Sequence, residues 1–196
     1  MRSCWPKLAR LAERAGRHYP SIESPDLALN QATAWAIRRV GGHLRANPAR
    51  AVRDSIWDDD DLAGLLGDAR EWTRIRSDQV LVAEEFLDRL VGGLLGIRLD
   101  GLGGRLEISP SLPQEWRHFR IRRLRAHRTL LDLDIKSRAE WLTIKVALMF
   151  GPPMPVAVSS FSATVSRVAV DEIPMEGPRA VFTIGGEHEV TLYYGV

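Results

Sequence analysis

The sequence has little cysteine and no long apolar run. Its 196 residues include one cysteine, Cys4, so no disulfide can form within the chain. Cys4 has no neighbouring base, and a lone thiol in that setting does not indicate a nucleophile. No stretch approaches the ~20 apolar residues of a membrane span. The start, MRSCWPKLARLAER, has no apolar signal core. We therefore expect a cytoplasmic protein without a membrane partner.

Metal and phosphate motifs are also missing. The five histidines have no HExxH or CxxC partner, so the sequence predicts no metal and no cofactor. Gly101, Gly103 and Gly104 precede a predicted strand rather than a helix, which excludes the phosphate cradle of a dinucleotide fold. The histidines are His18, His43, His118, His127 and His188.

Acidic residues gather in two places, and neither indicates a catalytic site. Asp58–Asp61 lack the alternating spacing of a calcium loop and suit the start of a helix, where acids are favoured. Glu84 and Glu85 are adjacent on a predicted helix, so they point about 100° apart and do not face one substrate together. The net charge of +2 neither demands nor excludes an anionic partner.

The first half of the chain has the periodicity of helices. Predicted helices cover residues 1–16, Ser24 to Gly42, a piece that opens at Asn47-Pro48 and runs to 57, a stretch after 61, and 77–95. In the last of these, apolar residues recur at helical spacing. They are Val80, Ala83, Leu87, Leu90, Val91 and Leu94.

Beyond residue 95 the period falls from 3.6 to 2. Leu131, Leu133 and Ile135 alternate with polar residues, as in a half-buried strand. Eight strands are predicted, which suit an antiparallel sandwich. They cover 105–108, 117–126, 131–136, 141–149, 156–159, 165–170, 180–184 and 189–194. The sequence therefore predicts an α+β protein, with a helical segment over 1–95 packed on an antiparallel β-sandwich over 96–196.

The seam between the halves reads LLGIRLDGLGGRLEISPSLPQEW from Leu94 to Trp116. It resembles glycoside hydrolases and disaccharide phosphorylases of the (α/α)6-barrel, or six-hairpin, type at the point where the last barrel helix passes into a C-terminal β-sandwich. Leu99 stands where that pattern usually has proline. The resemblance extends to Ile135. It implies the last barrel helices and sandwich of such an enzyme, with Trp116 lying between helix and sandwich.

This resemblance carries no catalytic residue to the chain, because the family's carboxylates lie upstream of the seam and no residue here matches them. We expect a non-catalytic portion that supports a barrel and is inactive alone. Its partners would be carbohydrate, and a missing upstream barrel chain or further copies of itself. One alternative is an active glycoside hydrolase assembled from several copies, and another is a binding module.

The ligand-binding candidates are two arginines and two tryptophans. In RHFRIRRLRAHR, Arg120 and Arg122 are predicted to face outward from a strand, with a β-bulge at Arg122-Arg123. They could bind phosphates, but no aromatic residue alternates with them, which disfavours nucleic acid. Asp132 and Asp134 on the next predicted strand could instead pair with them. Trp116 and Trp141 are candidates for stacking on sugar rings.

Overall fold

The computed structural model describes residues 20–48, 63–67, 69, 80–100, 104–113, 115–160 and 164–195. The predicted helix over 1–16, most of the piece from 48 to 57, and the acidic run 58–61 lie outside the described residues. Asn47 and Pro48, which were expected to open a helix, form a short strand instead.

The described helices agree with the apolar periodicity. Helix α2 covers Leu27–Arg39, and the carboxylate of its N-cap Asp26 accepts a hydrogen bond from the Leu29 amide at 2.9 Å. Residues 63–67 and 69 are also helical. Helix α4, Val80–Asp88, continues as a π-helix, η1, over Arg89–Leu94. The predicted helix over 24–42 is therefore confirmed, with the cap at Asp26 rather than Ser24, and the one over 77–95 is confirmed from residue 80 onward, where the described residues begin.

Two sheets form the rest of the described chain. The larger has eight strands in the order β1-β6-β7-β8-β13-β10-β11, with β2 also paired to β6. These are β1 Ser21–Glu23, β2 Leu44–Arg45, β6 His118–Ala126, β7 Thr129–Ser137, β8 Trp141–Phe150, β10 Val165–Val170, β11 Ile173–Met175 and β13 Glu187–Tyr194. The smaller has the order β12-β9-β5-β4-β3. These are β3 Asn47–Pro48, β4 Ile97–Leu99, β5 Leu106–Ile108, β9 Met154–Ser159 and β12 Arg179–Ile184.

All eight predicted strands are present, and most pairs are antiparallel. Five short strands of two or three residues each were not predicted, namely β1, β2, β3, β4 and β11. Three strand pairs are parallel, namely β2–β6, β3–β4 and β5–β9. Strands β1 to β3 come from the predicted helical segment, so that segment contributes to both sheets.

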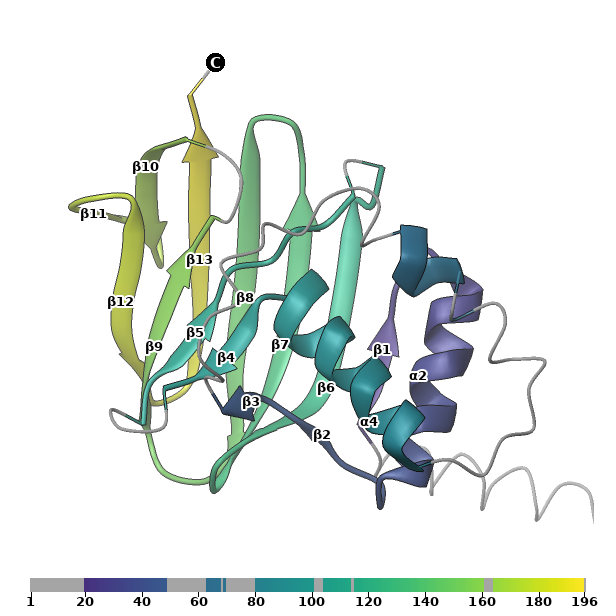
Figure 1. Ribbon diagram of the computed structural model, residues 1–196. Coiled ribbons are helices and arrows are strands. Elements are labelled where there is room, and N and C mark those ends of the chain that lie inside the picture. The colour runs from purple at the N-terminus through teal and green to yellow at the C-terminus, as the bar shows by residue number, and fades with distance from the viewer. Residues whose placement is uncertain are drawn as a thin grey trace, which may run out of the picture.

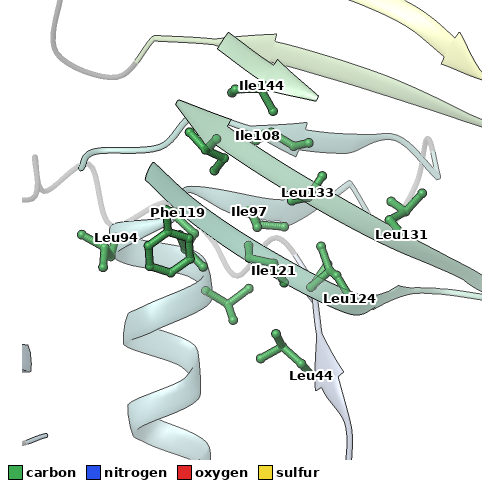
Figure 2. Packing of buried hydrophobic residues seen from close by; sticks show 14 of the residues in the cluster. Leu44, Leu94, Ile97, Ile108, Phe119, Ile121, Leu124, Leu131, Leu133 and Ile144 are labelled. Atoms are coloured by element: carbon green, nitrogen blue, oxygen red, sulfur yellow. The ribbon is translucent and has the colours of Figure 1, made fainter. Parts of the chain in front are cut away.

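The two sheets face each other, and α4 with η1 lies in the same layer as the smaller sheet (Figure 1). Helix α2 lies beside α4 and next to β1 at the edge of the larger sheet (Figure 1). One apolar cluster joins the helices and both sheets. Figure 2 shows part of it, with Leu94 of η1, Ile97 of β4, and Phe119 and Ile121 of β6 directed into the same interior. Helix and sheet therefore share one core.

The seam is held by a close backbone crossing at Gly96. The Ser109 amide donates to the Gly96 carbonyl at 3.2 Å, and the Ser111 amide donates to the Leu94 carbonyl at 2.9 Å. Gly96 has φ +55°, a conformation that favours glycine, and a Cβ there would overlap the carbonyl of Ser109. Leu95 and Ile97 on either side are fully buried. Glycine at this position lets the helix turn directly into the small sheet.

We predict that Gly96→Ala lowers the free energy of unfolding by at least about 2 kcal/mol, because the new methyl group meets backbone and the positive φ is strained. Urea denaturation followed by circular dichroism measures this change. Gly185→Ala is the matched control, since a Cβ there meets nothing within 4 Å. Equal stability of the two variants would show that the crossing at Gly96 tolerates a side chain.

Candidate functional site

The outer face of the larger sheet carries most of the candidate side chains. On β6 the alternation buries Phe119, Ile121 and Leu124 completely, and it turns Arg120 and Arg122 outward. The β6–β7 register shifts between Ile121 and Leu124, and Arg123 has φ +59°. The β-bulge predicted at Arg122-Arg123 is therefore confirmed, and it leaves no arginine of this strand pointing into the core.

Opposite charges alternate across this face along one row of neighbouring strand positions. The register aligns Glu23 of β1, Arg120 of β6, Asp134 of β7, Lys145 of β8 and Glu189 of β13. Directly opposite charges on neighbouring strands stabilise a sheet. Each basic residue of the row therefore has an acidic residue on both sides, and the three acids exceed the two bases by one negative charge.

Asp134 is the centre of the tightest polar cluster on this face. Its carboxylate accepts hydrogen bonds from His118 Nε2 at 2.8 Å and from Arg120 Nε at 2.9 Å, and Arg120 also reaches Glu23 at 3.3 Å. Partial burial alone would raise the pKa of the Asp134 carboxyl, but the hydrogen bonds from Arg120 and His118 outweigh it and lower that pKa. The Asp134 hydrogen bond raises the pKa of Arg120. Asp134 is therefore an ionised acceptor at neutral pH.

A second cluster forms where the bulge meets β7. Arg122 lies 2.9 Å from Asp132, whose other oxygen accepts the Arg123 amide at 2.7 Å. The pairing of Asp132 and Asp134 with Arg122 and Arg120, one of the two interpretations of the sequence, is thus what the structure contains. Arg120 and Arg122 are both engaged within the protein, and a ligand role for either stays a prediction.

The two tryptophan candidates lie on opposite sides of the sheet. Trp116 is buried and stacks on Phe119, with ring centroids 6.0 Å apart, which agrees with its expected place between helix and sandwich. Trp141 is partly exposed on the outer face, opposite Tyr193 of β13. Arg138 lies 5.9 Å from the Trp141 ring centroid, and Arg167 lies 4.1 Å from that of Tyr193. The candidates therefore do not form a common site.

Sequence reasoning missed a second outward row at the other end of the sheet. Arg45 of β2 aligns with Arg125 of β6, Arg125 with Leu130 of β7, and Leu130 with Phe150 of β8. Phe150 is 72% exposed, and both arginines are exposed. The alternation in FRIRRLRA could have placed Arg125 outward. No local pattern could have placed Arg45 or Phe150 beside it, because they come from distant parts of the chain.

The four acids of α4 and β7 that were considered in the sequence are not arranged as a catalytic pair. Glycoside hydrolysis needs two carboxyl groups across one pocket, and the acid of the pair needs a raised pKa. Glu84 and Glu85 are exposed on α4, and Asp132 and Asp134 are held by arginines. Within the described ranges no three histidine, cysteine or acidic side chains gather as a metal site. The helices in those ranges include none long and apolar enough to cross a membrane.

Comparison with known proteins gives no family model and no curated sequence that matches the chain. Among solved structures it is similar to an α-L-rhamnosidase from Dictyoglumus thermophilum, at 9% identity over 59% of this chain and 14% of that one, with a TM-score of 0.43. It is also similar to a GH127 β-L-arabinofuranosidase from Geobacillus stearothermophilus T6, at 7% identity over 60% and 19%, with a TM-score of 0.42.

A third similar structure is the α-L-rhamnosidase from Streptomyces avermitilis complexed with L-rhamnose, at 16% identity over 58% of this chain and 11% of that one, with a TM-score of 0.38. The chain spans less than a fifth of the length of each of these enzymes. Likeness at these TM-scores does not establish a shared fold, so the properties of the site rest on its own residues.

We predict that Asp134→Asn lowers the free energy of unfolding by about 1 kcal/mol at neutral pH, because Arg120 and His118 lose an ionised acceptor. The pKa of Asp134 is lower when folded than its unfolded value of about 3.9. Its contribution is therefore present above about pH 4 and is lost as the pH falls through the folded pKa.

Urea denaturation of wild type and Asp134→Asn across this pH range measures the difference. Glu187→Gln is the control. Glu187 forms an exposed ion pair with Lys145 at 2.7 Å, so this substitution is expected to leave the free energy of unfolding unchanged. A difference between wild type and Asp134→Asn that stays constant down to low pH would contradict the role of the ionised carboxylate.

Proposed function

We propose that this chain is a non-catalytic portion of a carbohydrate-active enzyme, in which it supports a catalytic barrel. The observation that carries the proposal is the seam. Leu94, Ile97, Ile108 and Trp116, which lie in the stretch that resembles barrel glycosidases and phosphorylases, are all buried where helix and sandwich meet. The burial of these four side chains supports a role for this stretch as a packing junction.

The contacts of Asp132 and Asp134 are consistent with a non-catalytic role for this chain. A general acid must hold its proton at working pH, whereas the pKa of Asp134 is lowered by its partners. Both oxygens of Asp132 are engaged, one by Arg122 at 2.9 Å and the other by the Arg123 amide at 2.7 Å. Neither carboxylate is therefore available to a glycosidic oxygen. The carboxylates of the reaction would come from a barrel contributed by other residues.

The alternative of an active enzyme assembled from several copies predicts an apolar helical face left for the partner copy. Among the described helical side chains, Leu27 is the single large hydrophobic residue that is exposed, at 68%. Glu84, Glu85 and Asp88 on α4 are exposed and acidic. These features favour the supporting role over self-assembly.

We predict that the purified chain is monomeric and turns over no glycoside. Light scattering gives its mass, and release of sugar from α- and β-linked disaccharides, with and without phosphate, gives its activity. A mock purification from cells without the gene controls for host glycosidases. Turnover that follows an oligomeric peak, and is absent from the mock sample, would overturn the proposal and favour the assembled enzyme.

A second candidate function is oligosaccharide binding at Trp141. It is favoured by the register, which sets the partly exposed Trp141 and Tyr193 side by side on the outer face, where aromatic rings can stack on sugars. The guanidinium of Arg167 on Tyr193 would have to move for a sugar to reach that ring face. We predict that Trp141→Ala abolishes any binding of neutral oligosaccharides in isothermal titration. Binding that survives this change would exclude the Trp141 platform.

A further inference from the structure

One part of the outer face of the large sheet carries arginines that have no counter-ion among the described residues. Arg45, Arg125, Leu130 and Phe150, here called the arginine–phenylalanine row, occupy neighbouring positions on β2, β6, β7 and β8. Directly paired residues of a sheet share a face, so all four side chains lie on the outer side. Four strands at about 4.8 Å spacing make the row roughly 14 Å long.

The arginines of β6 differ in their ion pairing between the two ends of the strand. Arg120 and Arg122 each face an aspartate of β7, at 2.8 and 2.9 Å. Arg125 on the same strand faces Leu130 on one side and Arg45 on the other. Among the described residues neither Arg45 nor Arg125 has an ion-pair partner. Like charges directly opposite each other destabilise a sheet. An anion bound between them would remove that cost.

Phe150 is held in its exposed position by two turns packed against each other. Thr129 Oγ1, after the β6–β7 turn, donates to the Pro152 carbonyl at 3.1 Å. Gly151 has φ +107°, and a Cβ there would lie 2.5 Å from the Arg128 carbonyl, so the turns touch. The β7–β8 register shifts between Leu130 and Leu131, which turns Phe150 toward Leu130. The backbone that carries the Phe150 ring is thus held in place by contacts between the two turns.

We propose that the arginine–phenylalanine row binds a carboxylate-bearing polysaccharide laid across the strands. Guanidinium groups bind carboxylates through paired, charge-assisted hydrogen bonds, and an aromatic face packs against the apolar face of a sugar ring. The row has an aromatic ring at one end and two arginines at the other. It therefore matches a polysaccharide that has both carboxylate groups and the apolar faces of sugar rings. The preference for a sugar acid over other polyanions rests on the proposed function.

Other occupants use the row less completely. A neutral sugar leaves both arginines unpaired. Single-stranded nucleic acid is bound by successive aromatic side chains, whereas Phe150 is the one aromatic residue in the row. An anionic lipid surface would engage exposed apolar tips, here Phe150 and Met149, with the arginines at its phosphates. The flat position of Arg45 and Arg125 on the sheet favours an extended glycan over a membrane.

The test is isothermal titration of the purified chain with polygalacturonate and with the same polymer fully methyl-esterified, which keeps the sugar and removes the charge. We expect binding to the acid form, weakening with added salt, and at least tenfold weaker binding to the ester. The double variant Arg45→Gln/Arg125→Gln should have an affinity for the acid form that is lower by about tenfold or more. Phe150→Ala should weaken it severalfold. Without ligand, Phe150→Ala should keep wild-type thermal stability, because that side chain is exposed. The double variant should be at least as stable as the wild type, because it removes two like charges that face each other.

Arg179→Gln is the matched control, since Arg179 is an exposed arginine on β12 of the smaller sheet. It should bind polygalacturonate as the wild type does. Equal loss in Arg179→Gln and in the double variant would overturn the site, as would equal binding of acid and ester. Tighter binding to phosphatidylserine vesicles or to oligo-dT, lost in the row variants, would overturn the glycan and assign the row to that anion.

The outcomes also separate this site from the supporting role. An inactive monomer that does not bind polygalacturonate overturns the site and leaves the supporting role standing. A chain that binds polygalacturonate and also hydrolyses glycosides overturns the supporting role and leaves the site standing.

Discussion

The large sheet must bury one apolar face, and the rest of the structure follows from how that face is covered. The smaller sheet is built largely of short strands and lies over only part of it, and α4 with η1 occupies the same layer (Figure 1). A helix can leave that layer and enter the small sheet only if the backbone turns sharply between buried residues. Gly96 provides the turn, with Leu95 and Ile97 buried on either side. Helix and sandwich are therefore one packing unit rather than two modules that happen to touch.

The opposite face of the same sheet is organised by electrostatics. Strand β6 contributes outward arginines, and β7 contributes aspartates at the facing positions, so most of the charge is balanced within the sheet. Such pairs fix the register of two strands because a shift by one residue would bury the arginines. The bulge at Arg122-Arg123 serves the same end, since it keeps Leu124 inside and Arg125 outside. Where the aspartates stop, at Leu130, the positive charge of Arg125 is left over.

Local pattern predicted the long elements of this fold. Period-two alternation located β6, β7, β8 and β10 within a few residues, and the apolar stripe located α4 and η1. The bulge was predictable because two arginines in succession interrupt an otherwise regular alternation. Short strands such as β1 and β3 were not predictable, because two or three residues carry no period and their pairing with β6 and β4 depends on tertiary contacts. For the same reason the sequence could not show that α2 is bracketed by β1 and β2, which pair with the same strand.

The features of the candidate site likewise divide into those that local sequence pattern predicts and those that depend on tertiary contacts. The pairing of Arg120 with Asp134 was foreseeable from two alternating strands adjacent in sequence. The burial of Trp116 against Phe119 agrees with a place at the seam, but its stacking geometry comes from packing. The arginine–phenylalanine row depends on three separate parts of the chain that only the sheet register brings together. The sheet pairs Arg120 and Arg122 with Asp134 and Asp132. It also sets Arg45 against Arg125, two strands from the exposed Phe150, and this opposition of like charges is a local cost that its core does not require. A bound anion would convert that cost into binding energy.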